Sequence, residues 1–291
     1  MGHPIHIGIS TCPNDTFAFD ALMRNLVDTR GLDFHFELLD IQQLNDALRA
    51  GRFDVVKTSF HAALLLADQL RVLPSGSALG FGVGPLLLAA RDGAVPRDSS
   101  QRTLCPGIDT TATLLIRIFY PSTTQIDHVV FSQIMPDLKS GKADFGVCIH
   151  EGRFTWQNEG LHLVEDLGQR WERETKCPLP LGGLVARRSL DDELTGRIQA
   201  CIADSIGWGL SHRDETLPTM RRHAQEFDDA VLMQHVDLYV NDWTVDLGTV
   251  GRQALATLST LARRSGIVGH DAPPIEVFES TDARPALPAK D

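Results

Sequence analysis

The segment LNDALRAGRFDV at residues 44–55 has a counterpart, MPDLKSGKADFGV, at residues 135–147. Each segment reads as the end of a helix, a glycine, a basic residue and then an aspartate directly before a β-prone run. Gly51 and Gly141 follow the helical patterns, where a glycine accepts the left-handed conformation that other residues resist. Two similar units about ninety residues apart predict two similar domains.

Around the first unit, short apolar runs alternate with longer helical patterns, which predicts an α/β protein with mixed, mostly parallel sheets covered by helices. The predicted strands are residues 5–10, 34–40 and 55–58, and the first predicted helices are residues 16–27 and 41–50. Residues 190–265 are predicted to be helical, including helices at 194–210 and 246–264.

The boundaries of the second domain are predicted from two apolar strands. Residues 86–90 follow a segment rich in Gly and Pro, and residues 183–186 follow a Pro-rich loop. We expect the chain to leave the first domain near one strand and to return near the other, with a ligand cleft between the domains. The predicted division is residues 1–92 plus 184–291 for the discontinuous first domain and residues 93–183 for the inserted second domain.

Charge and composition limit the partners. A net charge of -11 disfavours nucleic acids and anionic membranes, which carry charge of the same sign. No apolar run approaches the roughly 20 residues needed to cross a bilayer, and the start of the chain lacks the pattern of a secretory signal. We therefore expect a cytoplasmic protein that binds a small molecule, and the sequence leaves open whether it forms a homodimer.

Motifs for metals and nucleotides are missing from the sequence. The five cysteines are scattered without a Cys-x-x-Cys spacing, so they indicate neither a zinc site nor a disulfide framework. The sequence contains no Walker phosphate loop, no dinucleotide fingerprint after a strand and no His-Glu-x-x-His helix. Chemistry without a cofactor or metal is therefore favoured.

Candidate site residues follow the predicted strands, because ligands of open parallel sheets bind at the carboxyl ends of the strands. Lys57, Thr58 and Ser59 end the third strand with an ammonium and two hydroxyls. The corresponding strand of the second unit ends at Ile149 and runs into His150. An imidazole titrates near neutral pH and is the commonest general base. Glu151 and Arg153 beside it could orient the loop as an ion pair or could be solvated charges.

Two predicted helix starts also face the cleft. Asn14 lies just before the first predicted helix, and Thr110, Thr111 and Ala112 lie at the start of a helix predicted at residues 112–120, after a Pro-Gly turn. Free N–H groups at a helix start can bind a carboxylate or a carbonyl oxygen. Plain capping, by Asn14, Asp15 or Thr16 in the first case and by a threonine in the second, is the alternative.

Four motifs, in this order along the chain, give a resemblance to a known family. The chain resembles the 1,4-dihydroxy-6-naphthoate synthases of the futalosine route to menaquinone. The motifs are STCPNDTF at residues 10–17, GSALGFGVGP at 76–85, IHEGRF at 149–154 and LPLGG at 179–183.

The resemblance implies a type II periplasmic-binding-protein-like fold and a carbon-carbon lyase without cofactor. The substrate would be cyclic dehypoxanthine futalosine and the product 1,4-dihydroxy-6-naphthoate, with His150 as the proton-abstracting base. Combined with the strand-end argument, the predicted substrate-binding residues are Asn14, Asn45, Lys57, Thr58, Ser59, Thr110, Thr111, Ala112, Ile149 and Gly182. Gly152 and the pair Ile108-Asp109 depart from the family pattern, so the resemblance does not define the detailed shape of the pocket.

Two other functions share this architecture. A non-catalytic solute-binding protein would have the same two domains, although it should carry an export signal. Chorismate dehydratase of the same pathway resembles the fold and is also cofactor-free, but the His150-Glu151 pair and the CPNDT segment at residues 12–16 disfavour it.

Overall fold

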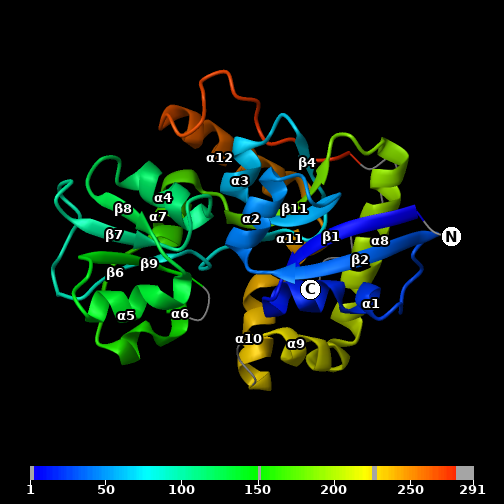
Figure 1. Ribbon diagram of the computed structural model, residues 1–291, viewed down its shortest axis with the longest axis horizontal. Coiled ribbons are helices and arrows are strands. Elements are labelled where there is room, and N and C mark those ends of the chain that lie inside the picture. The colour runs from blue at the N-terminus through cyan, green and yellow to red at the C-terminus, as the bar shows by residue number, and fades with distance from the viewer. Residues whose placement is uncertain (1–2, 150–151, 225–227, 280–291) are drawn as a thin grey trace.

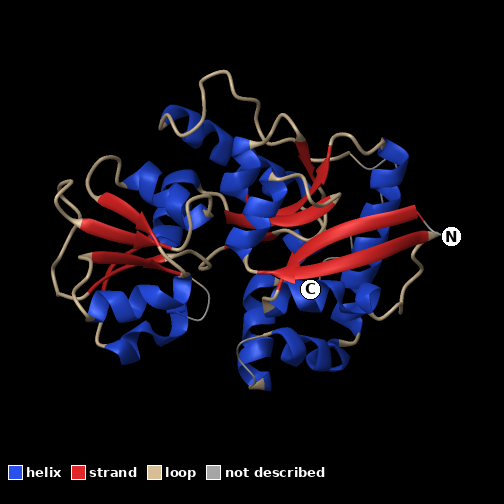
Figure 2. Ribbon diagram, in the orientation of Figure 1, coloured by secondary structure: helices blue, strands red, loops and turns tan. Residues whose placement is uncertain are grey.

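The computed structural model describes residues 3–149, 152–224 and 228–279, which form two lobes lying side by side (Figure 1). Each lobe contains its own β-sheet with helices packed on its faces, as Figure 2 shows. The predicted α/β class is therefore confirmed, and the two lobes correspond to the two sheets.

The first sheet has the strand order β2-β1-β3-β11-β4, with β5 paired to β11. β1 runs parallel to β2 and β3, whereas β11 runs antiparallel to its neighbours. The three strands predicted near the N-terminus are β1, β2 and β3. The strands of this sheet are β1 (His3–Ser10), β2 (Leu32–Leu39), β3 (Val55–Ser59), β4 (Leu70–Val72), β5 (Ala78–Gly80) and β11 (Leu179–Arg187).

The second sheet has the order β10-β6-β9-β7-β8. β7 runs parallel to β8 and β9, while β6 runs antiparallel to β9 and β10. Among the strand pairs of the two described sheets, parallel pairs thus occur only in β2-β1-β3 and β8-β7-β9, because the strands that follow the crossings between the lobes run the opposite way. The sheets are mixed, as predicted, but they are not mostly parallel. The strands are β6 (Leu86–Ala89), β7 (Arg102–Cys105), β8 (Gln125–His128), β9 (Phe145–Cys148) and β10 (His162–Asp166).

The repeated units occupy equivalent places in the two sheets. Asp54 accepts a hydrogen bond from the N–H of His6 in β1 at 2.8 Å, and its own N–H donates to the His6 carbonyl at 2.9 Å. Asp144 makes the same pair of bonds with Arg102 in β7, at 2.9 and 3.0 Å. The carboxyl ends of β3 and β9 therefore correspond, and the predicted repeat is confirmed.

The chain crosses between the lobes before β6 and again before β11. The division at residues 92 and 183 stays a prediction for the folding units, but β6 lies in the second sheet and β11 begins at Leu179 in the first. The sheets thus place both crossings a few residues earlier. Gly84, at the first crossing, touches Gly168 in the first turn of α7, and a Cβ on either would lie 2.2 to 2.6 Å from the other's Cα. A side chain at either position would force the first crossing away from α7.

The first helix begins earlier than predicted. Cys12 is its N-cap in an extended conformation, and Pro13 occupies the first helical position, which suits the fixed φ of proline. Capping by Asn14, Asp15 or Thr16 is therefore wrong. This helix, α1 (Pro13–Met23), packs against β1 and three helices of the C-terminal region.

The other helices cover the two sheets. The predicted helices at residues 41–50, 112–120, 194–210 and 246–264 are α2, α4, α8 and α12, and α9, α10 and α11 lie in the stretch 190–265 that was predicted to be helical without separate bounds for them. The bounds are α2 (Ile41–Arg49), α3 (Phe60–Leu65), α4 (Thr111–Phe119), α5 (Ile134–Lys139), α6 (Gly152–Thr155), α7 (Leu167–Thr175), α8 (Asp192–Ser211), α9 (Leu217–His223), α10 (Asp229–Tyr239), α11 (Asp242–Val245) and α12 (Gly248–Arg264). Short 3-10 turns are η1 (Phe131–Gln133), η2 (Trp156–Glu159) and η3 (Arg213–Thr216).

Candidate active site

Two adjoining cavities lie between the lobes. The inner chamber has a volume of about 130 Å³ and is lined mainly by β1, β3 and the starts of α1 and α4. The outer chamber has a volume of about 980 Å³ and is lined by the start of α2, the segment after β8 and α10. The chambers adjoin each other, since both are lined by Ser10, Cys12, Ile41, Ile149 and His235.

Most of the predicted substrate-binding residues line the inner chamber. Asn45 and Thr58 do not line it and are completely buried behind it. His150 lies outside the described residues, although Ile149 lines both chambers. Contact of these residues with a substrate stays a prediction. The predicted residues that line the inner chamber are Asn14, Lys57, Ser59, Thr110, Thr111, Ala112, Ile149 and Gly182.

Asn45 sets the orientation of the Ser59 hydroxyl. Its Oδ1 accepts hydrogen bonds from the Ser59 N–H at 3.1 Å and from the Thr58 hydroxyl at 2.8 Å. Because a backbone N–H can only donate, this contact identifies the acceptor side of the amide. The Asn45 Nδ2 then donates to Ser59 Oγ at 3.2 Å. Ser59 is left with its hydroxyl proton to donate to a ligand.

A buried ion pair forms one wall of the inner chamber. Lys57 Nζ lies 2.7 Å from Asp15 Oδ1, and both side chains are more than nine-tenths buried. Lys57 also donates to the Gly76 carbonyl at 2.9 Å, and Asp15 accepts further bonds from Ser10 and Asn14. An ammonium has three donor hydrogens, so one Lys57 N–H remains for a ligand. The sequence analysis did not predict that Asp15 pairs with Lys57, a contact that depends on β1 and β3 being neighbours.

The start of α4 forms the opposite wall. The Thr110 hydroxyl accepts from the Thr113 N–H at 3.3 Å and donates to the Gly107 carbonyl at 3.0 Å, so plain capping is correct for this side chain. The Thr111 hydroxyl donates to the Leu181 carbonyl at 2.5 Å. The backbone N–H groups of Thr111 and Ala112 lie in the first turn, which has no acceptor within the helix. These groups can stabilise negative charge on a ligand oxygen.

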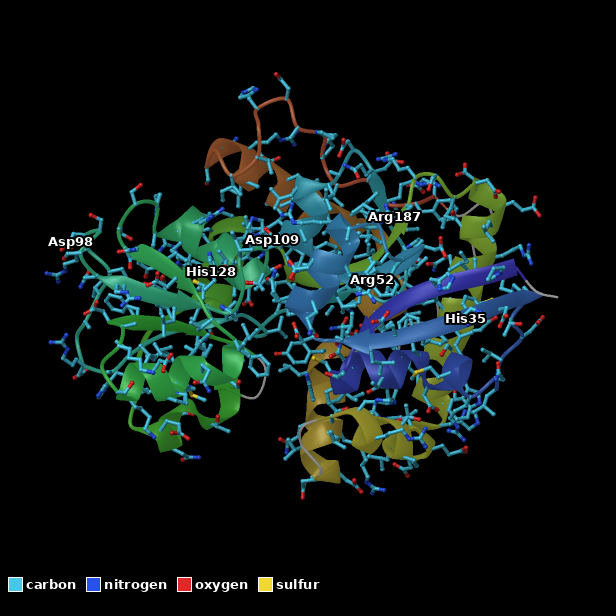
Figure 3. The ribbon with its side chains drawn as sticks, viewed as in Figure 1. His35, Arg52, Asp98, Asp109, His128 and Arg187 are labelled. Carbon is cyan, nitrogen blue, oxygen red and sulfur yellow. The ribbon has the colours of Figure 1, made fainter. Side chains whose placement is uncertain are left out.

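The first lobe holds the turn before α4 in place. Arg49 pairs with Asp109 at 2.6 Å, and Asn45 donates to the Asp109 carbonyl at 3.4 Å. Figure 3 shows Asp109 where the two lobes meet. His61 Nδ1 lies 3.1 Å from the Thr110 carbonyl oxygen. Because a carbonyl oxygen can only accept, Nδ1 carries the imidazole proton and donates this hydrogen bond. The α4 start is thus positioned against Ser59 by contacts from α2 and α3.

His61 should make stability depend on pH. Burial lowers the pKa of its imidazole from 6.5 to about 4. His61 therefore becomes protonated below about pH 6.5 in the unfolded chain but only below about pH 4 in the folded chain. Since the unfolded chain binds the proton more tightly, the free energy of unfolding falls as the pH is lowered from 6.5 to 4. The full loss is about 3 kcal/mol.

Urea unfolding at pH 7 and pH 4.5 measures this effect. The variant His61→Gln should show a smaller loss of stability between the two pH values than the unaltered protein, whereas His270→Gln, at a fully exposed position, should not. An identical pH dependence in His61→Gln would contradict the assignment.

Arg153 makes contacts that the sequence did not predict. It pairs with Asp166 at 2.8 Å and donates to the Gly84 carbonyl at 2.5 Å. The ion pair with Glu151 stays a prediction, because Glu151 lies outside the described residues. Asp166 in turn caps α7. Arg153 therefore fastens the segment after β9 to the crossing between the lobes.

Neither a metal-binding cluster nor a membrane-spanning helix is found in the part of the chain that the structure describes. Among residues 3–149, 152–224 and 228–279, no three His, Cys, Asp or Glu side chains gather to hold a metal ion. No helix in that part of the chain is long and apolar enough to cross a membrane.

A family described as menaquinone biosynthesis matches residues 5–264 of the chain. The chain belongs to this family. Two relatives bear the name 1,4-dihydroxy-6-naphtoate synthase. The Streptomyces coelicolor protein is 40% identical over 271 residues, which are 91% of this chain and 94% of that protein. The Thermus thermophilus protein is 37% identical over 273 residues, 94% of this chain and 99% of that protein. The chain is thus similar to two enzymes of menaquinone biosynthesis, and we assign it to that process as an enzyme.

Solved structures show the fold of this menaquinone-biosynthesis protein. Protein AF1704 from Archaeoglobus fulgidus superposes with a TM-score of 0.85 at 29% identity, covering 91% of this chain and 99% of that chain. The periplasmic aliphatic sulphonate binding protein SsuA from Escherichia coli gives a TM-score of 0.62 at 12% identity, covering 100% and 98%. The predicted periplasmic-binding-protein-like fold is confirmed.

Proposed function

We propose that the protein is a 1,4-dihydroxy-6-naphthoate synthase that converts cyclic dehypoxanthine futalosine to 1,4-dihydroxy-6-naphthoate. The observation that carries the proposal is the likeness to two synthases over more than nine-tenths of the chain. The reaction is a carbon-carbon lyase step that uses side chains alone.

The inner chamber supports this chemistry. Release of a sugar-derived fragment and aromatisation of the ring need a proton removed beside a carbonyl and negative charge stabilised on oxygen. The Ser59 hydroxyl, the free Lys57 N–H and the first N–H groups of α4 are donors fixed in position before a ligand binds. Preorganised donors of this kind stabilise an oxyanion better than water does, because they need no reorganisation.

His150 is the proposed base. It follows Ile149, which lines both chambers, and it follows the strand that corresponds to β3. A neutral imidazole takes up a proton near neutral pH. Closure of the lobes would exclude water from the reactive intermediate.

Ser59→Ala tests the donor role of the inner chamber. Loss of the hydroxyl should reduce transition-state stabilisation by about 1 to 3 kcal/mol, because a buried substrate oxygen loses its partner. The measurement is kcat/KM, with Ser99→Ala at an exposed loop position as the control. An unchanged kcat/KM in folded Ser59→Ala would remove Ser59 from the proposed site.

The proposed function is tested by supplying the purified protein with cyclic dehypoxanthine futalosine and, separately, with chorismate. We expect dihydroxynaphthoate from the first substrate and no reaction with the second. Formation of 3-enolpyruvyl-benzoate from chorismate would identify the sister enzyme instead. Binding of the first substrate without any conversion at high protein concentration would indicate a solute-binding protein.

A further inference from the structure

The outer chamber takes no part in the chemistry described so far. It is several times larger than the inner chamber, at about 980 Å³ against about 130 Å³. Its walls come from both lobes: the start of α2 and α10 on one side, and the end of β8 with the following turn on the other. A cavity of this size is in the range of small-molecule sites, about 300 to 1,000 Å³.

The charge of the outer chamber limits what it can bind. No lysine or arginine is among the described residues that line it. Its acidic lining residue, Asp40, uses Oδ1 to cap α2 and keeps Oδ2 outside the cap. Without a cation the chamber does not suit a phosphate or carboxylate, which pair with Arg or Lys. The inner chamber, in contrast, has Lys57 in its lining.

Other polar groups of the outer chamber can donate and accept hydrogen bonds. His128 ends β8, and Ser132 and Gln234 line the chamber from the following turn and from α10. Burial, assisted by Arg117, lowers the pKa of His128, so its imidazole is neutral near pH 7 and offers one donor and one acceptor. Figure 3 labels His128 in the second lobe. Imidazole, amide, hydroxyl and a carboxylate oxygen together suit a group bearing several hydroxyls.

The apolar part of the lining suits the carbon skeleton of such a group. Ile108 and Val130 of the second lobe and Val231 on α10 are large apolar side chains that are exposed in this structure and line the outer chamber. Ligand sites are mostly apolar with a few polar groups that fix orientation. Each of these side chains would be covered by a ligand that fills the chamber.

We propose that the outer chamber binds the hydroxylated, sugar-derived half of the substrate while the inner chamber binds the aromatic half. This assignment rests on the proposed function. The bond that breaks joins the two halves, so it would lie where the chambers meet, beside Ile149 and Cys12. The outer chamber thereby distinguishes the complete substrate from the bare aromatic acid that is the product.

The test compares two ligands. The product, 1,4-dihydroxy-6-naphthoate, should occupy only the inner chamber, whereas the substrate should occupy both. In His128→Ala and Gln234→Ala we expect kcat/KM for the substrate to fall about tenfold, as for the loss of one ligand hydrogen bond. The dissociation constant of the product should stay within about twofold of that of the unaltered protein, since no contact with the product is removed.

Two further variants serve as controls. Ser59→Ala should weaken the binding of both ligands. His270→Ala, at a fully exposed position, should leave the binding of both unchanged. Circular dichroism and the thermal midpoint establish that each variant is folded.

Three outcomes would overturn the assignment. If His128→Ala and Gln234→Ala weaken product binding by as large a factor as they lower kcat/KM for the substrate, the outer chamber binds the ring. If both variants react and bind like the unaltered protein, the chamber binds neither half. If the unaltered protein does not convert the substrate at all, the proposed function fails and this assignment fails with it.

Discussion

Replacing His150 by Asn is expected to remove most turnover while leaving the fold and the affinity for product nearly unchanged. Asn is of similar size and keeps a hydrogen-bond donor, but it cannot take up a proton near neutral pH. General bases contribute about 10²- to 10⁴-fold to the rate, so kcat/KM should fall by a factor in that range. The position of Ile149 in the lining of both chambers and the correspondence of β9 with β3 support the choice of this residue.

The control for His150→Asn is His162→Asn, which replaces a half-exposed histidine outside the lining of both chambers. The control should retain full activity. The limb of the pH–rate profile due to the base should also disappear in His150→Asn, which a merely structural defect would not cause. Near-normal turnover by folded His150→Asn would refute its role as the base.

Asp15→Asn should strongly destabilise the protein. The change leaves the Lys57 ammonium buried without its counter-charge, and breaking a buried ion pair from one side costs about 3 to 5 kcal/mol. The free energy of unfolding in urea measures the loss. Lys57→Met combined with Asp15→Asn should recover part of it, because the uncompensated charge is then removed.

A matched control uses an exposed ion pair of similar length. Lys139 lies 2.6 Å from Glu159, and both side chains are well exposed. Glu159→Gln should cost no more than about 1 kcal/mol, as is usual for a surface pair. Equal losses in Asp15→Asn and Glu159→Gln would show that burial of the Lys57–Asp15 pair has no energetic role.

The fold was predictable where local pattern and periodicity agree. Gly51 and Gly141 both adopt the left-handed conformation, with φ of +78° and +74°, and each precedes an aspartate that ties two parallel strands together. The strands that follow the two crossings, β6 and β11, were harder to assign to a sheet. The apolar run of β6, for example, does not indicate which sheet it joins. The helical pattern of the sequence is weaker in the region of α9, α10 and α11. The packing of this region on α1 joins distant parts of the chain, so local sequence does not indicate it.

The candidate site was predictable where it depends on strand ends. Lys57, Ser59 and Ile149 follow directly from the rule that ligands bind beyond the carboxyl ends of parallel strands. The partner of Lys57 was not predictable in the same way. Asp15 lies in the first turn of α1 and contacts Lys57 only because β1 and β3 are neighbours. His128 was missed because the short strand β8 has no distinctive pattern.

A structure of the protein with bound 1,4-dihydroxy-6-naphthoate is the most direct test of the account. We predict the ring in the inner chamber, with one of its oxygens within hydrogen-bond distance of Ser59 Oγ or of the N–H groups of Thr111 and Ala112, and the His150 imidazole facing the ring. A product molecule bound in the outer chamber, or a His150 side chain turned away from both chambers, would contradict it.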